Sequence, residues 1–341
     1  MMTGFAPLLS KSRRGEALTR AEMRCAMDLL LENAVGEDEI AAFLLALKAR
    51  GETVEEIVAA AEAMRARALS VVAPPGAIDT CGTGGDGADT YNVSTAAALI
   101  VAGCGVPVAK HGNRSASSRS GSSDVLAALG VNLDAAPATI ARCIAEAKIG
   151  FMFAAYHHRA VAHVAAVRRK LGVRTMFNVL GPLANPAGAR RQLMGVYDRA
   201  LTAPLAAALG RLGAEHAWVV CGADGLDELT TTGPSFVSET RGGVERSFTL
   251  TPEDAGLSRA ASADLKGGDP AHNAAALRRL LAGERGPYRD IAVLNAAASL
   301  IVAGVSSTLI DGAARAANAI DEGAAKAALD RLVAISNERP A

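Results

Sequence analysis

The stretch AIDTCGTGGDGADTYNVSTAAALIVAG, residues 77–103, decides the fold. It starts with a short apolar run from Ala77 to Cys81 and then turns through a glycine-rich segment from Gly82 to Gly87. From Asn92 onward the residues follow an apolar helical pattern. A strand, a tight turn and a helix in this order are typical of one unit of an α/β protein. The stretch therefore predicts a sheet whose strands are followed by helices.

The same alternation recurs further along the chain. Short apolar runs that end in glycine or polar residues precede other helical patterns: Val106 to Ala109, Ile149 to Phe153, Gln192 to Tyr197 and Ala217 to Cys221. This alternation predicts an α/β fold with a largely parallel sheet and crossover helices. We also expect a β-excursion from Val237 to Leu250 and Ala-rich helix from Pro270 onward. Ligands of such sheets bind at the carboxyl ends of the strands, where the polar clusters of this chain lie.

The residues before the deciding stretch have the pattern of helices. Thr19 with Glu22, and Thr53 with Glu56, match the capping box of a helix N-terminus. Apolar residues follow the helical spacing at Ile40, Phe43, Leu44 and Leu47. Pro74 to Gly76 then break the pattern. These signals predict a helical domain that ends at this break.

Domain boundaries follow from these patterns. We expect residues 1–75 to form a helical domain, completed by a helical stretch near 161–186, and residues 76–341 to form an α/β domain. Half of the 341 residues are hydrophobic and 21% are charged, which is typical of a folded chain and not of a disordered one.

Charge and cysteine content exclude several classes of protein. Lys and Arg number 35, as do Asp and Glu, so the formal net charge is zero, and we expect no nucleic-acid partner. The five cysteines have no C-x-x-C spacing, which argues against a disulfide framework or a zinc site and favours a cytoplasmic location. The apolar runs are shorter than the roughly 20 residues that span a bilayer, so we expect no membrane role.

The glycine-rich segment and the helix after it suggest an anion site. Glycines allow the backbone of Gly82 to Gly87 to approach an anion closely, but the segment matches neither the P-loop nor the dinucleotide pattern. The helix opens with Asn92-Val93-Ser94-Thr95, which places amide and hydroxyl groups where the helix dipole favours negative charge. The alternative is a tight turn followed by an ordinary N-cap at Ser94 or Thr95, and capping and phosphate binding are compatible.

A second polar cluster, KHGNRSASSRSGSSD at residues 110–124, follows the strand expected to end near Ala109. It combines cations with many small hydrogen-bond donors, a composition that suits phosphate or diphosphate oxygens. The alternative is a solvated Ser-rich loop, and His111 is as compatible with a structural hydrogen bond as with a ligand contact.

A third cluster, GADGLDELT at residues 222–230, contains the adjacent acids Asp227 and Glu228. Neighbouring carboxylates repel each other unless a cation lies beside them, which favours a magnesium role. The alternative is that both are ordinary acids at a helix N-terminus. Since magnesium commonly holds phosphates, this cluster and the two anion-binding clusters fit one site.

A basic stretch, VRRKLGVRT at residues 167–175, leads into FNVLGPLANP at residues 177–186. Basic residues on a helix usually form a solvated face, and we interpret Arg169 and Lys170 in this way. The Pro and Gly residues that follow predict a rigid turn.

In this order the motifs resemble the anthranilate phosphoribosyltransferase family, whose members join anthranilate to phosphoribosyl diphosphate in tryptophan biosynthesis. The resemblance is carried by Gly82 to Asp86, Asn92 to Thr95, Lys110 to Gly121, Arg168 to Pro186 and Gly222 to Leu229. It extends into the helical N-terminus and so covers nearly the whole chain. It implies transfer of the phosphoribosyl group of 5-phosphoribosyl 1-diphosphate to the amine of anthranilate, with release of diphosphate.

The resemblance also implies an architecture and a cofactor. The expected fold is that of the nucleoside phosphorylase and class II phosphoribosyltransferase type. In this fold a small helical domain is hinged to a larger α/β domain that has a mostly parallel central sheet and binds phosphoribosyl diphosphate. The active site lies between the domains, a homodimer forms through the helical domain, and Mg²⁺ is the expected cofactor.

Site residues follow from the resemblance by matching positions. The positions implied to contact the substrates are Gly82, Gly85, Asp86, Thr90, Asn92, Val93, Ser94, Thr95, Lys110, His111, Gly112, Asn113, Arg114, Ser115, Ala116, Ser117, Ser118, Ser122 and Arg168. Those implied to bind magnesium are Ser94, Asp227 and Glu228. Gly82, Asn113 and Arg168 are implied to face anthranilate. The catalytic candidates are Lys110, which would neutralise the departing diphosphate, and Arg168, which would hold the acceptor carboxylate.

The chain departs from the family pattern at a few positions. His158-Arg159-Ala160 stands where the family often has His-Pro-Ala, Ala166 replaces a usual proline, and Cys221 stands where histidine is common. These changes bear on the path by which anthranilate enters. They leave the phosphate-binding motifs untouched.

Two other functions are alternatives. Pyrimidine nucleoside phosphorylases share the fold and a related Lys-His loop, but such chains generally carry a further C-terminal domain, and this sequence ends at Ala341. A non-catalytic paralogue that binds nucleic acid belongs to a different class, and the zero net charge argues against it. An assay for loss of anthranilate that depends on phosphoribosyl diphosphate and magnesium separates these alternatives.

Overall fold

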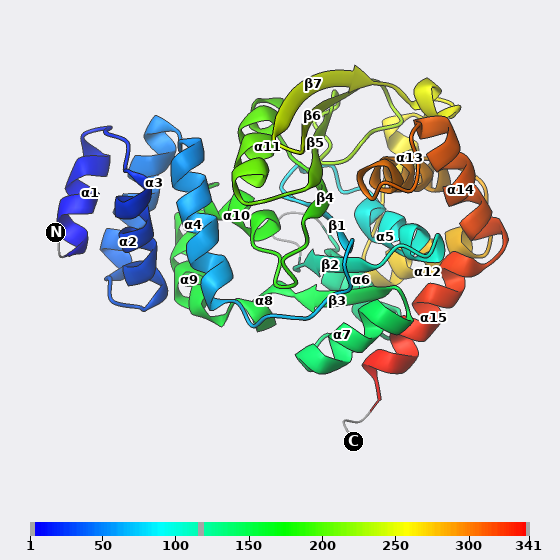
Figure 1. Cartoon of the computed structure of the whole chain (residues 1–341), viewed down its shortest axis with the longest axis horizontal. Coiled ribbons are helices and arrows are strands. Elements are labelled where there is room, and N and C mark those ends of the chain that lie inside the picture. Colours follow the sequence, from blue (N-terminus) through cyan, green and yellow to red (C-terminus); the bar gives the residue numbers. More distant parts are fainter. Residues whose placement is uncertain (1–3, 115–118, 339–341) are drawn as a thin grey trace.

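The computed structural model describes residues 4–114 and 119–338. At the N-terminal end lie α1 (Phe5–Arg13), α2 (Arg20–Leu31), α3 (Glu37–Arg50) and α4 (Val54–Arg67), packed together to one side of the sheet (Figure 1). Thr19 and Thr53 are the N-caps of α2 and α4, and each forms the predicted reciprocal capping box, with Glu22 and with Glu56. Local hydrogen bonds therefore fix where these two helices begin.

Within the described residues, seven strands form one sheet in the order β3-β2-β1-β4-β5-β6-β7. The parallel strands are β1 (Ile78–Gly82), β2 (Val108–Gly112), β3 (Ile149–Phe153), β4 (Arg191–Gly195) and β5 (His216–Gly222). The expected β-excursion is an antiparallel hairpin at one edge, made of β6 (Ser235–Arg241) and β7 (Val244–Leu250). The predicted α/β fold with a largely parallel sheet is confirmed.

One predicted strand boundary is wrong. β2 does not end near Ala109 but continues through Lys110 and His111 to Gly112, because these residues stay paired in register with Phe151–Phe153 of β3. The apolar pattern stops at the first charged side chain, whereas the backbone pairing does not. Lys110 and His111 therefore project from the sheet itself, and both are buried.

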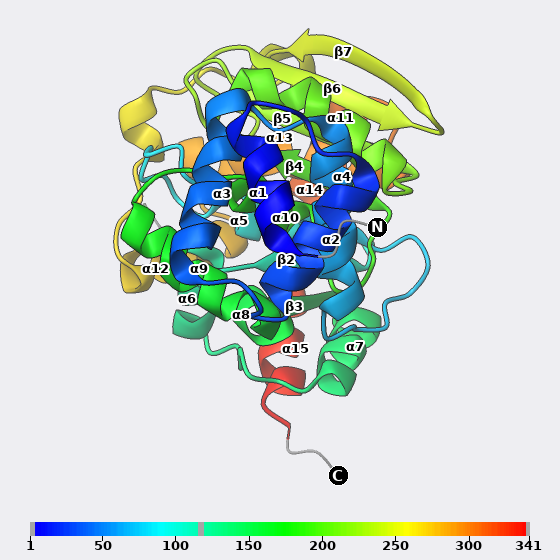
Figure 2. The ribbon, with the colours of Figure 1, turned by 90° about the vertical axis from the view of Figure 1, so that its left-hand side faces the viewer.

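Helices cover both faces of the sheet (Figures 1 and 2). On one face α5 (Val93–Gly103), α13 (Pro287–Val302) and α15 (Ala324–Ser336) contribute to one core, and on the other α10 (Phe177–Leu183) and α11 (Thr202–Arg211) contribute to a second. Successive residues of β5 alternate between these cores: Trp218 and Val220 belong to the first, Val219 and Cys221 to the second. This is the two-residue period of a strand that is covered on both faces.

Shorter elements complete the described part of the chain. The other α-helices are α6 (Ser122–Ala128), α7 (Pro137–Glu146), α8 (Ala154–His157), α9 (Ala162–Leu171), α12 (Pro270–Leu281) and α14 (Leu309–Asp321). Single 3₁₀ turns are found at η1 (Arg159–Val161), η2 (Arg199–Leu201), η3 (Pro252–Ala255) and η4 (Ser262–Leu265). No helix in the described ranges combines the length and the apolar character needed to cross a membrane.

The N-terminal helices share a core with the neighbouring half of the α/β unit. Val164 and Val167 of α9 and Phe177 and Leu180 of α10 belong to the same buried cluster as residues of α1 to α4. This cluster also reaches β4, β5 and α11. In Figure 2 the N-terminal helices lie in front of the sheet with α9 beside them, and in Figure 1 α10 lies between α4 and the sheet. The stretch expected to complete the helical domain thus packs against it.

Candidate active site

The carboxyl ends of the parallel strands bring two of the predicted clusters together. The backbone N–H of Gly84, after β1, donates a 2.7 Å hydrogen bond to Oδ2 of Asp227, which lies in the loop after β5. The N–H of Ser94, in the first turn of α5, donates a 3.0 Å bond to Oε1 of Glu228. We call this region the candidate site: the loops at 82–92 and 222–230, the start of α5, and the end of β2 with residues 113 and 114.

Two glycines leave the space that Asp227 occupies. A Cβ on Gly82 would lie 2.3 Å from Oδ2 of Asp227, and a Cβ on Gly195, at the end of β4, would lie 1.5 Å from its carbonyl oxygen. Gly84 and Gly85 have φ values of 65° and 81°, in the left-handed region that favours glycine. The glycine-rich pattern therefore serves both the turn and the close approach of the acidic loop.

Burial and mutual repulsion dominate the electrostatics of the acid pair. Burial raises the pKa of Glu228 to about 7, although the positive charge of Lys110 opposes this shift. Burial also raises the pKa of Asp227, and the nearby carboxylates of Glu228 and Asp86 raise it further. Both acids lie in a loop rather than at a helix N-terminus, so the alternative interpretation of them as helix acids is wrong.

The acid pair fits a partly hydrated cation better than a protein cage. Asp86, Asp227 and Glu228 repel one another, and a divalent cation beside them would relieve this repulsion. In the described residues no three His, Cys, Asp or Glu side chains are arranged to hold a metal ion by themselves. Magnesium is usually held by one or two carboxylates, waters and substrate phosphates, so the residues present fit it.

Lys110 is close enough to the acid pair for their charges to interact. Its side chain is 1% exposed, and Nζ donates a hydrogen bond to the carbonyl oxygen of Thr80 on β1. Burial lowers its pKa, while the charges of Asp79, Glu228 and Asp227 oppose that shift. Lys110 is therefore a counter-charge to the acids that surround it.

His111 contacts α10. Its Nδ1 lies 3.1 Å from the carbonyl oxygen of Gly181, and its ring centre lies 5.1 Å from that of His158. Burial, with the neighbouring His158, His157 and Lys110, lowers the pKa of His111 to about 3. The structural hydrogen bond considered for His111 is present, and its Nε2 has no partner within the described residues.

At the end of β2, Gly112 packs closely against the start of α6, whereas Arg114 in the loop that follows is exposed. A Cβ on Gly112 would lie 2.3 Å from Oγ of Ser122, which donates a 3.3 Å hydrogen bond to the carbonyl oxygen of Asn113. The side chain of Arg114 is 71% exposed, with Nε 3.9 Å from Oδ1 of Asp124. The predicted contacts at Ser115, Ala116, Ser117 and Ser118 lie outside the described residues.

At the start of α5 the residues have different tasks. The helix begins at Val93 with Asn92 as its N-cap, so the alternative of an ordinary N-cap at Ser94 or Thr95 is wrong. The Asn92 side chain instead links segments: Nδ2 donates to the carbonyl oxygen of Ser120 at 3.1 Å, and Oδ1 accepts from Asn273 at 3.0 Å. Thr95 is buried, and its hydroxyl has no partner in the described part of the chain.

Arg168 projects from the end of α9 toward α10. Its Nη2 donates a 3.4 Å hydrogen bond to Oδ1 of Asn178, and its guanidinium carbon lies 5.6 Å from the centre of the Phe177 ring. Burial lowers its pKa, and no ion pair holds it among residues 4–114 and 119–338. Arg169 and Lys170 are exposed, as expected for a solvated face.

Two residues that hold parts of the candidate site together, Arg174 and Asp79, were not predicted from the sequence. Arg174 donates a hydrogen bond from Nη2 to the carbonyl oxygen of Gly85, so it reaches the glycine-rich loop. Asp79 on β1 accepts from Asn185 at 2.7 Å and from the backbone of His111 at 3.1 Å, and burial raises its pKa to about 6. The contacts of Arg174 with Gly85 and of Asp79 with Asn185 join residues 89 and 106 positions apart, so no local sequence pattern predicts them.

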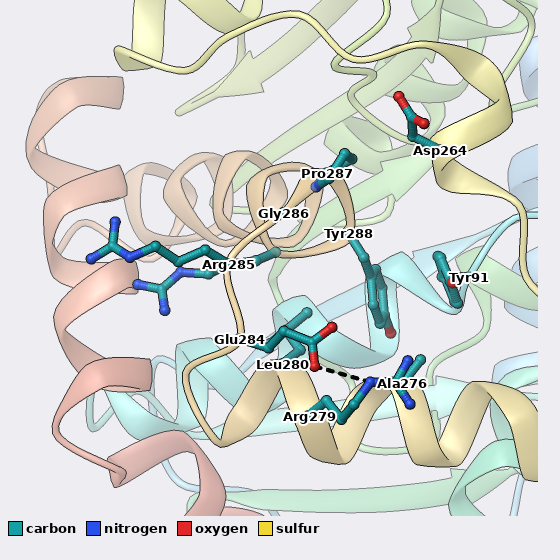
Figure 3. Close-up of a pocket in the computed structure, with 11 residues that line it drawn as sticks. Tyr91, Asp264, Ala276, Arg279, Leu280, Glu284, Arg285, Gly286, Pro287 and Tyr288 are labelled. Carbon is teal, nitrogen blue, oxygen red and sulfur yellow. Dashed lines mark ion pairs between the residues drawn. The ribbon is translucent and has the colours of Figure 1, made fainter.

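Of two cavities in the described residues, the first borders the candidate site at Tyr91 and the second lies away from it. One, of about 150 Å³, is lined by Tyr91 and Tyr288, whose rings stack with centres 4.3 Å apart beside the ion pair of Arg279 and Glu284 (Figure 3). The other, of about 430 Å³, lies between residues 67–69 and residues 156–160.

Comparison with known proteins defines the class. The helical bundle domain of a glycosyl transferase family matches residues 6–68, and the a/b domain of a glycosyl transferase family matches residues 74–326. Together with the polar site at the carboxyl edge of the sheet, these matches define a glycosyl transferase built from a helical bundle and an α/β domain.

Relatives of known activity resemble the chain over almost its full length. Anthranilate phosphoribosyltransferase of Methylobacterium nodulans is 59% identical, over 98% of this chain and 100% of the relative. The enzyme of Rhodospirillum rubrum is 61% identical, over 96% and 94%. The chain belongs to the anthranilate phosphoribosyltransferase family.

Solved structures agree with this assignment. The crystal structure of anthranilate phosphoribosyltransferase from Thermus thermophilus matches with a TM-score of 0.92 and 46% identity, over 97% of this chain and 99% of that one. The Saccharomyces cerevisiae enzyme, solved in complex with PRPP and Mg, matches with a TM-score of 0.88 and 27% identity, over 98% of each chain.

Proposed function

We propose that the candidate site is where this chain performs the reaction of its family. That reaction transfers the phosphoribosyl group of 5-phosphoribosyl 1-diphosphate to the amine of anthranilate, in tryptophan biosynthesis. The observation that carries the proposal is the pair of hydrogen bonds from Gly84 to Asp227 and from Ser94 to Glu228. They place two carboxylates beside backbone N–H groups that favour anions, an arrangement that suits a cation bound between acids and phosphates.

Phosphoribosyl diphosphate, the substrate that donates the phosphoribosyl group, is held chiefly by the loop at 82–87, the first turn of α5 and the end of β2. Glycine backbone and the hydroxyl of Ser94 offer hydrogen-bond donors without bulky side chains. Ser94, Asp227 and Glu228 are the residues that would hold magnesium, which when bound supplies positive charge to the departing diphosphate. The Saccharomyces cerevisiae structure, which contains PRPP and Mg, supports magnesium as the cofactor.

Lys110 contributes through charge. The bond between ribose C1 and diphosphate breaks with positive charge on the sugar and negative charge on the leaving group, so catalysis depends on stabilising diphosphate. The positive charge of Lys110 interacts favourably with Asp227 and Glu228 and so offsets part of their negative charge. It thereby allows both acids to ionise and bind a cation.

Arg168 holds anthranilate, the substrate that accepts the phosphoribosyl group. A guanidinium can grip a planar carboxylate with two parallel hydrogen bonds, which aligns the weakly nucleophilic amine of anthranilate for attack on C1. Asn178 and Gly181 are three residues apart, so Arg168 and His111 contact α10 at positions about one turn from each other. Gly82 and Asn113 complete the acceptor side, and the reaction needs no general base before the new bond forms.

The test is an assay for loss of anthranilate fluorescence. Purified protein should consume anthranilate only when both phosphoribosyl diphosphate and Mg²⁺ are present. The double variant Asp227→Asn with Glu228→Gln should lose at least about a hundredfold in turnover, since its metal ligands are gone, while keeping its melting temperature. Phosphorolysis of uridine or thymidine, or activity without Mg²⁺, would contradict the proposal.

Assembly and location belong to the same proposal. The chain forms a homodimer through the helical domain of residues 1–75, hinged to an α/β domain of residues 76–341, and works in the cytoplasm. Light scattering behind a sizing column should give about twice the 34.7 kDa mass of the chain. A monomeric mass at micromolar concentration would contradict the dimer.

A further inference from the structure

Arg174 reaches from the segment between α9 and α10 to the glycine-rich loop after β1. Its Nη2 donates a hydrogen bond to the carbonyl oxygen of Gly85, and its guanidinium carbon lies 4.0 Å from the centre of the Tyr197 ring. A Cβ on Gly85 would lie 3.6 Å from Nε of Arg174, so the guanidinium rests against the loop backbone. Arg174 therefore has a fixed place between a donor loop and an aromatic ring.

In the described residues, the position of the Arg174 side chain is not due to an ion pair with an acidic residue. Within residues 4–114 and 119–338, no carboxylate oxygen lies within 4.0 Å of the Arg174 guanidinium. The side chain is exposed, so its position does not contribute to a buried core. The contacts with the Gly85 carbonyl and the Tyr197 ring use the planar, forked shape of the guanidinium, which lysine lacks.

The same segment carries the residue assigned to the acceptor. Oδ1 of Asn178 accepts a 3.4 Å hydrogen bond from Arg168 and a 3.0 Å hydrogen bond from the backbone N–H of Thr175. Thr175 directly follows Arg174. The side-chain oxygen of Asn178 thus links Arg168, the residue proposed to bind anthranilate, to Thr175. Thr175 is the chain neighbour of Arg174, which contacts the glycine-rich loop.

We propose that Arg174 is a positioning residue that couples the two substrates. It holds the backbone at Gly85 in the conformation that accepts the donor, and it does so best when Arg168, Asn178 and Thr175 are ordered by the acceptor. Coupling between two ligands is reciprocal, so each substrate should strengthen the binding of the other. This inference rests on the proposed function, since it takes the glycine-rich loop as the donor site and Arg168 as the acceptor site.

Initial rates over a grid of both substrate concentrations, at saturating Mg²⁺, test the coupling. In the wild type, the KM for phosphoribosyl diphosphate should fall by about fivefold as anthranilate rises from far below to far above its own KM. In Arg174→Ala this dependence should disappear, and the KM at saturating anthranilate should be about fivefold higher. The melting temperature should not change, because the side chain is exposed.

Matched variants separate coupling from simple charge. Arg174→Lys should behave like Arg174→Ala, and Tyr197→Phe should keep the coupling that Tyr197→Leu weakens, since only the leucine removes the ring. Arg169→Ala, which removes an exposed arginine of the preceding helix α9, should match the wild type. Full rescue by lysine, or Arg174→Ala indistinguishable from wild type, would overturn the coupling role, whereas an inactive wild type would overturn the proposed function instead.

Discussion

Arg168 is a guanidinium in a partly buried position without an acid to pair with in the described structure. Its Nε is buried and has no hydrogen-bond partner there, and its pKa is lowered by burial. Taking a charge out of water without a partner destabilises a fold. An anionic ligand that pairs with Arg168 would remove this cost, which fits a role in binding a carboxylate.

Replacing this side chain should separate binding from stability. Arg168→Ala should raise the KM for anthranilate by roughly 10- to 150-fold, because a hydrogen bond to a charged group contributes about 1.5–3 kcal/mol. The KM for phosphoribosyl diphosphate should rise by no more than the roughly fivefold that is lost with the coupling, and the melting temperature should not fall. Steady-state kinetics and thermal melts of Arg168→Ala beside Arg169→Ala measure this. Equal effects on both substrates, or a larger effect at Arg169, would show that the wrong arginine has been assigned.

Two neighbouring histidines predict how stability depends on pH. Burial lowers the pKa of His111 to about 3 and that of His158 to about 4, and His157 and Lys110 add to the shift at His111. In the unfolded chain both titrate near 6.5, so below pH 6.5 the unfolded state binds more protons. Each histidine should therefore reduce the unfolding free energy by about 1.4 kcal/mol per pH unit as the pH falls toward 4.

A variant isolates this contribution from the buried acids. Asp79 and Glu228 have raised pKa values, so protonation of these acids stabilises the fold at low pH and opposes the histidines. His158→Phe keeps a ring but does not titrate. Urea unfolding of wild type and variant at pH 7, 6 and 5 should show a difference in free energy that grows in favour of the variant as the pH falls. A difference that stays constant would refute the assignment.

The elements around the site meet through glycines, and their packing predicts different outcomes for similar substitutions. At Gly195 a methyl group would collide with the backbone of Asp227, whereas at Gly82 it would chiefly meet the carboxylate of that residue. Gly195→Ala should therefore lose about 3 kcal/mol of unfolding free energy, as strong overpacking does.

Substitution at Gly82 should affect activity more than stability. Because the Asp227 side chain can rotate, Gly82→Ala should cost only about 1 kcal/mol of stability, yet lose activity as the carboxylate moves away from the cation. Gly233→Ala is the control, since nothing lies near its Cβ position. Denaturation and turnover measurements on the three variants check this order, and equal losses of stability at Gly82 and Gly195 would contradict it.

Short-range signals predict the elements better than they predict the site. The capping boxes at Thr19 and Thr53 depend on residues three positions apart, so the sequence alone locates both helix starts. The burial of Lys110 depends on strand pairing across the sheet, and the contact of Arg174 joins residues 89 positions apart. The motifs therefore indicate which loops meet, whereas only the fold shows which atoms of these loops contact each other.

At the scale of the molecule, the N-terminal helices and the sheet are joined by one continuous buried cluster. Arg65 of α4 adds hydrogen bonds to the carbonyl oxygens of Leu183, at 2.7 Å, and Leu212, at 3.1 Å. These connections predict a single cooperative unfolding transition. Scanning calorimetry at several protein concentrations should give one peak whose calorimetric and van't Hoff enthalpies agree. Two resolved peaks would mean that the helical and α/β parts unfold independently.

The glycine-rich loop has a consequence for enzyme redesign. Under the proposed function, the backbone of Gly84 and Gly85, which both have positive φ, contacts phosphoribosyl diphosphate, and main-chain groups stay the same whichever side chains surround them. The proposed anthranilate site, by contrast, is formed by side chains such as those of Arg168 and Asn178, which substitution can change. Libraries that aim at new aromatic amines should therefore vary α9 and α10 and leave residues 82–87 untouched. Changing the sugar phosphate would require a rebuilt backbone, which point substitution does not supply.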